Sequence, residues 1–109
     1  MNHLVYIAGP YTNPDPVVNT RTAVAMGLNI HDATGVGVIV PHLSLLAHAM
    51  YPNSVDYWYK FDLAQLANCT ALYRIAGDSI GADDEEKYAL NRGIPIFKDT
   101  RKLYRFVRS

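Results

Sequence analysis

A run of acidic side chains, Asp83 to Glu86, occupies the start of an expected helix. On a helical wheel Glu85 and Glu86 lie on the two edges of its apolar stripe, which consists of Ala82, Ala89, Leu90 and Gly93. A carboxylate that leans toward a buried sheet must be paired, protonated or functional. The structural alternative is that the helix dipole favours all of these acids, with Asp83 also pairing with Lys87. The wheel favours this alternative and does not choose between the two glutamates.

Two loops have the composition of an anion-binding site. Ser79-Ile80-Gly81 precedes the acidic helix and combines a hydroxyl group, a glycine that permits close backbone approach and free amides at a helix start. N-capping by Ser79 or Asp78 explains the same residues without a ligand. Gly9-Pro10-Tyr11-Thr12-Asn13, which follows the first apolar run, allows the same two interpretations. Neither loop matches the glycine-rich dinucleotide fingerprint or the P-loop.

Three further polar side chains could take part in chemistry. Tyr6 lies inside an apolar run, where its ring fills the core or its hydroxyl holds a catalytic carboxylate. Asp62 interrupts the apolar pattern of a helix, and the simpler interpretation is a solvated position. His42 and His48 are six residues apart, which suits no common metal spacing, and the single Cys69 excludes a cysteine-rich zinc site. The sequence therefore predicts no metal and no cofactor.

The elements that must position these residues alternate between strands and helices. Apolar runs that stop at Gly or Pro predict strands at residues 4–8, 36–40, 71–75 and 94–97. Helical patterns cover residues 17–33, 45–50, 53–68 and 82–92, and residues 103–107 form either a fifth strand or a terminal helical turn. Such alternation is typical of an α/β fold, a Rossmann-like (flavodoxin-like) three-layer sandwich with a four- to five-stranded parallel sheet. Because ligands bind beyond the carboxyl ends of such strands, we expect the chemistry on residues 9–13, 41–42 and 77–81.

Composition limits the class of protein. The 109 residues carry ten Lys and Arg against ten Asp and Glu, and half of them are hydrophobic. This balance suits one folded domain over residues 1–109. A neutral chain lacks the basic excess that binding to nucleic acid polymers or anionic membranes requires. No apolar run is long enough to span a membrane and no signal segment is evident, so we expect a cytoplasmic protein.

Four segments resemble the nucleoside 2-deoxyribosyltransferase-like superfamily, in order and over nearly the whole chain. They are Tyr6-Ile7-Ala8-Gly9-Pro10, Asp62-Leu63 ahead of Cys69-Thr70-Ala71-Leu72, Ser79-Ile80-Gly81-Ala82-Asp83-Asp84-Glu85 with Ala89, and Gly93-Ile94-Pro95-Ile96-Phe97. Members of this family cleave the N-glycosidic bond of nucleosides or nucleotides. The resemblance implies that Glu85 is the nucleophile and forms a glycosyl ester, that Tyr6 holds its carboxylate, and that Asp62 assists at the sugar or the departing base.

The resemblance also implies a substrate-binding set. Within the superfamily, the 2′-deoxynucleoside 5′-monophosphate N-glycosidases hold the phosphate with a serine six residues before the glutamate, as Ser79 stands here. The loop of Gly9, Pro10 and Tyr11 and the amide region of Gly81 would support the phosphate, and His42 would lie near the base.

The function implied by the resemblance is therefore a nucleotide N-glycosidase that works as a homodimer or a larger homo-oligomer. Two alternatives remain open. One is a nucleoside 2-deoxyribosyltransferase that exchanges bases. The other is a non-catalytic module that binds or senses a nucleotide.

Overall fold

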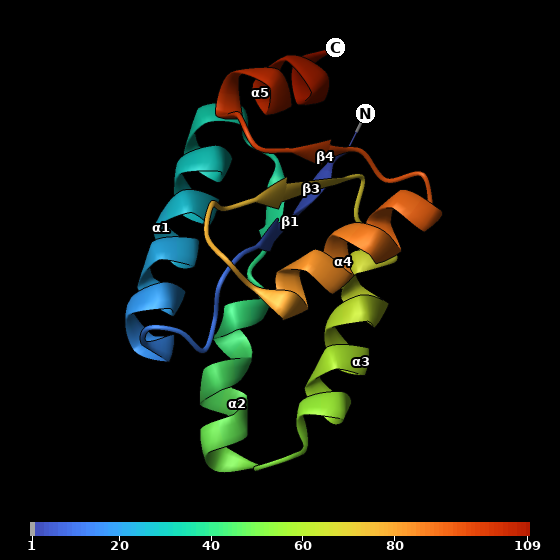
Figure 1. Ribbon diagram of the computed structural model, residues 1–109. Coiled ribbons are helices and arrows are strands. Elements are labelled where there is room, and N and C mark those ends of the chain that lie inside the picture. Colours follow the sequence, from blue (N-terminus) through green and yellow to red (C-terminus); the bar gives the residue numbers. More distant parts are fainter. Residues whose placement is uncertain (1) are drawn as a thin grey trace.

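The computed structural model describes residues 2–109. Its centre is a sheet of four parallel strands, β1 (Leu4–Ala8), β2 (Gly37–Ile39), β3 (Ala71–Arg74) and β4 (Ile96–Phe97), in the order β2-β1-β3-β4 (Figure 1). The register pairs Tyr6 with Ile39 on one side and with Leu72 on the other. The α/β Rossmann-like fold predicted from the sequence is confirmed, with four strands rather than five.

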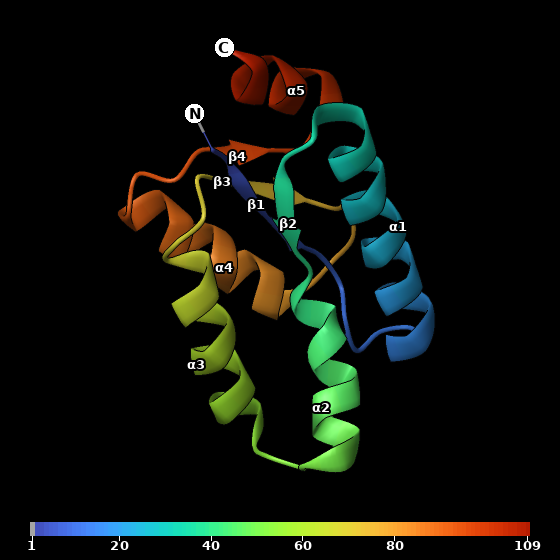
Figure 2. The ribbon, with the colours of Figure 1, turned by 180° about the vertical axis from the view of Figure 1, so that it is seen from behind.

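Helices cover both faces of this sheet. On one face lie α1 (Pro16–Thr34) and α5 (Thr100–Arg108), and on the other lie α3 (Val55–Leu66) and α4 (Ile80–Asn91) (Figures 1 and 2). The sequence of β1 supplies both cores, because successive strand residues point to opposite faces. Val5 and Ile7 pack toward α1 and α5, whereas Tyr6 and Ala8 pack toward α3 and α4.

Local sequence signals set the helix boundaries. The Asp15 side chain accepts hydrogen bonds from the amides of Val17 and Val18 at the start of α1, and Gly35 ends that helix with a φ of 78°. Ser54, Ser79 and Asp99 cap α3, α4 and α5 in the same way. None of the described helices has the length and apolar character that a membrane crossing requires.

The structure decides one open alternative about helices and corrects one expectation. The segment 103–107, left open between a strand and a helical turn, belongs to α5, where the Leu103 side chain is fully buried. Leu90, assigned to the apolar stripe of α4, is 67% exposed, because the buried face of this helix consists of Ala82, Glu85 and Ala89.

A short 3-10 turn (Pro41–Leu43) follows β2 and leads into α2 (Ser44–Met50). Together α2 and α3 extend beyond the carboxyl ends of β1 and β2 (Figure 1). We call these two helices the α2–α3 arm. The arm and the first turn of α4 enclose the region where the loops after β1, β2 and β3 meet.

Candidate active site

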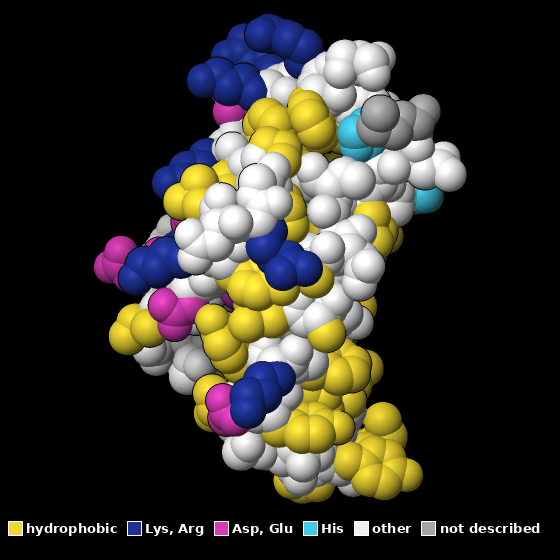
Figure 3. Space-filling view, turned by 90° about the vertical axis from the view of Figure 1, so that its right-hand side faces the viewer, with side chains coloured by type: hydrophobic (Ala, Val, Ile, Leu, Met, Phe, Trp, Pro, Cys, Tyr) yellow, Lys and Arg dark blue, Asp and Glu magenta, His cyan; other side chains and the backbone are white. Residues whose placement is uncertain are grey.

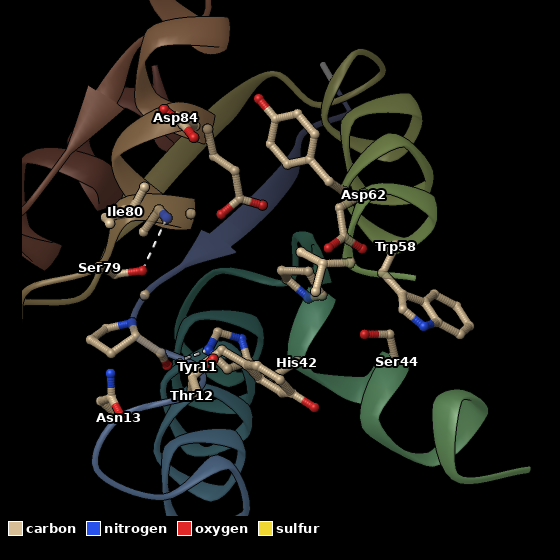
Figure 4. A pocket seen from close by; sticks show the side chains of 18 of the residues that line it. Tyr11, Thr12, Asn13, His42, Ser44, Trp58, Asp62, Ser79, Ile80 and Asp84 are labelled. Carbon is tan, nitrogen blue, oxygen red and sulfur yellow. Dashed lines mark hydrogen bonds between the residues drawn. The ribbon is translucent and has the colours of Figure 1, made fainter. Parts of the chain in front are cut away.

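A pocket of about 950 Å³ lies at the carboxyl edge of the sheet, between the α2–α3 arm and the start of α4 (Figure 4). Eight residues singled out from the sequence line it: Gly9, Pro10, Tyr11, His42, Asp62, Ser79, Gly81 and Glu85. The ninth, Tyr6, lies directly behind the wall and contacts Glu85. The topology thus brings together segments that are up to 79 residues apart in the chain.

Of the two glutamates that the helical wheel left open, Glu85 is the one that lines this pocket. It is 8% exposed, and one of its oxygens, Oε2, accepts a hydrogen bond from the hydroxyl of the fully buried Tyr6. Glu86 points elsewhere, toward Arg74 and Lys98. The helical wheel could not distinguish the two glutamates. In the structure, the Tyr6 hydroxyl donates its hydrogen bond to Glu85. Asp83 pairs with Arg74 rather than with Lys87, so that expected ion pair is wrong.

The environment of Glu85 shifts its titration toward neutral pH. Burial raises the pKa of Glu85 to about 7, while the hydrogen bond from Tyr6 and the charge of Arg74 act in the opposite direction. Burial and the neighbouring carboxylate raise the pKa of Tyr6 well above its ordinary value. The tyrosine therefore keeps its proton and remains a hydrogen-bond donor to Glu85.

Asp62 supplies a second carboxyl group to the pocket from α3. The simpler interpretation of Asp62, a solvated position, is wrong, because its side chain is half-buried. Among the described residues its Oδ1 atom finds no hydrogen-bond partner. Burial raises the pKa of Asp62 to about 7. The hydrogen bond from Tyr6 favours the ionised form of Glu85, whereas Asp62 Oδ1 receives no such bond from the described residues.

The start of α4 forms the opposite end of the pocket. The Ser79 hydroxyl oxygen accepts the amide hydrogen bond of Ala82 at 3.1 Å, so Ser79 is an N-cap. Its hydroxyl hydrogen remains available, and within residues 2–109 the amides of Ile80 and Gly81 donate to no other protein group. A Cβ atom at Gly81 would meet no atom within 4 Å, because this position borders open space. The capping and the anion-binding interpretations are therefore compatible.

The loop after β1 approaches the α4 start closely. Gly77 has a φ of 128°, and a Cβ atom there would lie 2.7 Å from the Pro10 ring. At Gly9 a Cβ atom would lie 3.0 Å from the Cβ of Ile75. These two glycines allow the loops after β1 and β3 to pack against each other, which brings Pro10 and Ser79 into one wall.

His42 holds the loop after β1 from the other side. The ring is 4% exposed and its Nε2 atom lies 2.8 Å from the carbonyl oxygen of Pro10. Because a carbonyl can only accept, Nε2 carries the proton, and Nδ1 is an acceptor without a partner among the described residues. Burial lowers the pKa of His42, which keeps the ring neutral. The Tyr11 ring packs edge-on against it at 5.9 Å.

Sequence reasoning missed two residues that line the pocket and one buried residue outside it. Trp58 and Tyr59 line the pocket as Asp62 does, and their positions four and three residues before it on α3 could have indicated a shared face. In Figure 4, Trp58 and Asp62 lie on one side of the pocket, and Ser79 and Asn13 on the other. Arg74, at the end of β3, is a buried cation whose only sequence signal was a charge inside an apolar run.

The described residues include no group of three or more His, Cys, Asp or Glu side chains placed to hold a metal ion. Five acidic residues line the pocket, and two of them are withdrawn from solvent: Glu85, which a tyrosine orients, and the half-buried Asp62. A paired carboxylate and carboxylic acid in one pocket can act as nucleophile and general acid.

Comparisons with known proteins identify the fold. No family model matches the sequence, and no curated protein matches it. Among solved structures, the chain is similar to a 2-deoxyribosyltransferase from the psychrotolerant bacterium Bacillus psychrosaccharolyticus, described as a biocatalyst for the synthesis of antiviral and antitumoral nucleosides. The TM-score is 0.59 and the identity 18%, over 85% of this chain and 69% of that chain. The chain therefore has a nucleoside 2-deoxyribosyltransferase-like fold, as its four sequence segments predicted.

Proposed function

We propose that this chain is an N-glycosidase that hydrolyses a (2′-deoxy)nucleoside 5′-monophosphate through a covalent glycosyl-Glu85 intermediate. The observation that carries the proposal is the buried Glu85 carboxylate, held by Tyr6 in the same pocket as Asp62, whose Oδ1 atom has no partner among the described residues. The similarity of the fold to a 2-deoxyribosyltransferase supports a substrate of the nucleoside class.

The proposed reaction has two steps. A Glu85 carboxylate oxygen attacks C1′ of the sugar, the C1′–N bond breaks, and the bonding electrons leave with the base nitrogen, which takes a proton from Asp62. Water then attacks C1′ of the glycosyl ester, returns its proton to Asp62 and releases the sugar phosphate with a free Glu85 carboxylate. The Tyr6 hydroxyl orients the Glu85 carboxylate for the first step and stabilises it as the leaving group of the second.

The start of α4 supports a phosphate on the substrate. The free amides of Ile80 and Gly81, the Ser79 hydroxyl and the positive end of the helix dipole together form a site for a dianion. The aromatic side chains of Trp58 and Tyr11 and the His42 ring lie in the same pocket and suit a planar base. The start of α4 therefore suits an anionic group of the ligand, and the aromatic side chains suit a planar group.

The experiment that tests the proposal measures the release of free base by chromatography. The panel contains 2′-deoxy and ribo nucleoside 5′-monophosphates and the matching nucleosides, each incubated with wild type and with Glu85→Gln. We expect release by wild type and a loss of about a thousandfold or more in the variant, because an amide is a very poor nucleophile. Preference for monophosphates over nucleosides would support the phosphate site at Ser79.

The similarity to a 2-deoxyribosyltransferase also favours a second candidate, the exchange of bases between nucleosides. In that case base release requires an added acceptor base, and the new nucleoside accumulates in place of free sugar. Saturable nucleotide binding without release from any panel member would refute both enzymatic functions and favour a sensing module.

We further propose that the chain forms a homodimer or a larger homo-oligomer. Its support is the set of exposed apolar side chains on the α2–α3 arm, where a partner subunit would also restrict solvent access to the pocket.

A further inference from the structure

Arg74 is a buried cation that the proposed mechanism does not use. It is the last residue of β3 and is 7% exposed, although arginine is rarely buried unless it is paired. Its guanidinium group makes four hydrogen bonds to the protein. These bonds reach two different segments, both of which contribute to the pocket.

One pair of bonds holds the first turns of α4. Nη1 donates to the Asp83 carboxylate at 2.8 Å and to the Glu86 carboxylate at 2.6 Å. These two residues lie on either side of Glu85 in the sequence, so the guanidinium group fixes the helix segment that carries the proposed nucleophile. Tyr6 contacts the same segment from β1.

The other pair of bonds holds the loop between β3 and α4. Nη2 donates to the carbonyl oxygen of Gly77 at 2.7 Å, and Nε donates to that of Ile75 at 3.0 Å. This loop leads into Ser79 and the free amides at the start of α4. A methionine would fill much of the same volume without the cost of burying a charge, and such replacements are often neutral or stabilising. Stability alone therefore gives a weak reason for an arginine here.

We propose that Arg74 is the positioning residue of this site: through Asp83, Glu86 and the Gly77 carbonyl it sets the place of Glu85 and of the α4 start relative to Tyr6. The proposal rests on the proposed function, in which Glu85 is the nucleophile. Arg74 touches neither Glu85 nor the pocket directly, so it acts through its partners.

Charge gives a second readout of the same contact. The groups that face Glu85 are Tyr6 from β1, Tyr59 and Asp62 from α3, Arg74 from β3 and Asp84 from α4 itself. Arg74 is the cation in this set, and it lowers the pKa of Glu85. A purely structural arginine, remote from the carboxylate, would leave that titration unchanged.

The test compares three variants with wild type. Arg74→Met removes the guanidinium group. The double variant Asp83→Asn/Glu86→Gln keeps Arg74 and removes the charges that it binds. Lys98→Met is the matched control, because Lys98 lies 3.9 Å from the same Glu86 carboxylate but is 70% exposed. The measurements are kcat and KM for base release over a range of pH, and the Tyr6 Cζ carbon resonance in protein labelled at tyrosine, which reports the hydrogen bond to Glu85 without turnover.

We expect Arg74→Met to lower the plateau kcat about ten- to a hundredfold, because a misplaced nucleophile is costly. The acid limb of its pH profile should also move about one unit higher. The double variant should lower the plateau kcat about tenfold without that upward movement. Both should displace the Tyr6 Cζ resonance, and Lys98→Met should alter none of these quantities.

Other results would overturn the proposal. If the double variant keeps wild-type kcat and the wild-type Tyr6 resonance, Arg74 acts by its charge alone, and if Lys98→Met is as damaging as Arg74→Met, the effect is general. Should Arg74→Met fail to fold, the double variant decides. A wild type that releases no base refutes the proposed function, and the Tyr6 resonance then still decides the positioning role of Arg74.

Discussion

Glu85 and Asp62, two of the acidic residues that line the pocket, have different hydrogen-bond environments, which is the basis for the different tasks proposed for them. Glu85 accepts a hydrogen bond from a buried tyrosine that keeps its own proton, so its ionised form is favoured. Asp62 is half-buried and its Oδ1 atom has no partner within residues 2–109, so burial favours its neutral form. Because the pKa of each is raised to about 7, we expect a bell-shaped rate profile with its maximum near neutral pH.

Tyr6→Phe tests whether the Tyr6 hydroxyl favours the ionised form of Glu85. Loss of the hydroxyl removes a hydrogen bond that lowers the pKa of Glu85, so a larger share of Glu85 is protonated at neutral pH. We expect kcat/KM to fall about ten- to a hundredfold and its acid limb to move to higher pH. The measurement is the pH dependence of base release. Tyr73→Phe is the control, because this buried tyrosine packs on the opposite face of the sheet.

Asp62→Asn tests whether the neutral form of Asp62 is favoured, by its effect on the free energy of unfolding. The pKa of Asp62 is raised in the folded state, from 3.8 to about 7, so the folded state binds more protons than the unfolded state between these values. The stability of wild type therefore falls as pH rises from about 4 to about 7. At pH 8 we expect Asp62→Asn to be more stable than wild type by about 1–2 kcal/mol, after allowance for solvent screening of a half-buried group.

Urea unfolding at pH 4 and at pH 8 measures this difference, which should vanish at the lower pH. Asp56→Asn, at an exposed position of the same helix, is the control and should show no comparable gain. An Asp62→Asn protein that is less stable than wild type at pH 8 would mean that the charged carboxylate is stabilising. Asp62 would then be unsuited to the role of general acid.

At the scale of elements, the start of α4 combines a structural and a binding task in one serine. Ser79→Ala removes the N-cap and should destabilise the protein by about 1 kcal/mol. It also removes a donor from the proposed phosphate site, so KM for a nucleoside 5′-monophosphate should rise about tenfold while KM for the matching nucleoside changes little. Steady-state kinetics on the two substrates measures this difference.

Ser54→Ala separates the two tasks of Ser79. Ser54 caps α3 with the same geometry, accepting the Tyr57 amide at 3.1 Å, but it does not line the pocket. This control should lose similar stability in thermal unfolding without a change in the preference for the phosphate. Equal effects of both variants on KM would remove Ser79 from the phosphate site.

The sequence predicted most elements because each carries local signals. Pro16 and Gly35 delimit α1, and apolar runs that stop at glycine or proline delimit the strands. The segment 103–107 remained ambiguous, since its aromatic and β-branched residues suit either a strand or a helix. Its capping by Asp99 and the burial of Leu103 in the core shared with α1 are consistent with the helix found there.

The candidate site was predictable where strand ends carry polar or glycine residues, as at Gly9 and Ser79. The environment of a side chain was not, because it depends on contacts between distant elements. Asp62 is half-buried where α3 meets α4, and neither helix alone signals that burial. The roles of Glu85 and Glu86 separate only when Tyr6 and Arg74, on two different strands, select one each.

At the scale of the whole molecule, apolar surface is unevenly distributed. Leu46, Met50, Tyr51 and Val55, all on or between the helices of the α2–α3 arm, are between 66% and 87% exposed. Figure 3 shows hydrophobic side chains gathered at the end of the molecule where this arm lies, while Lys and Arg side chains gather at the opposite end, over α5. A cluster of exposed apolar side chains of this kind is typical of an interaction surface.

We expect this patch to be the contact between copies of the chain. Wild type should have the mass of two or more chains by light scattering coupled to size-exclusion chromatography. The double variant Leu46→Lys/Met50→Lys should have the mass of one chain, because four buried charges across a symmetric contact repel each other. Leu90→Lys is the matched control, since Leu90 is equally exposed but lies on α4. A monomeric wild type at high micromolar concentration would contradict the homo-oligomer and leave the patch facing solvent beside the pocket.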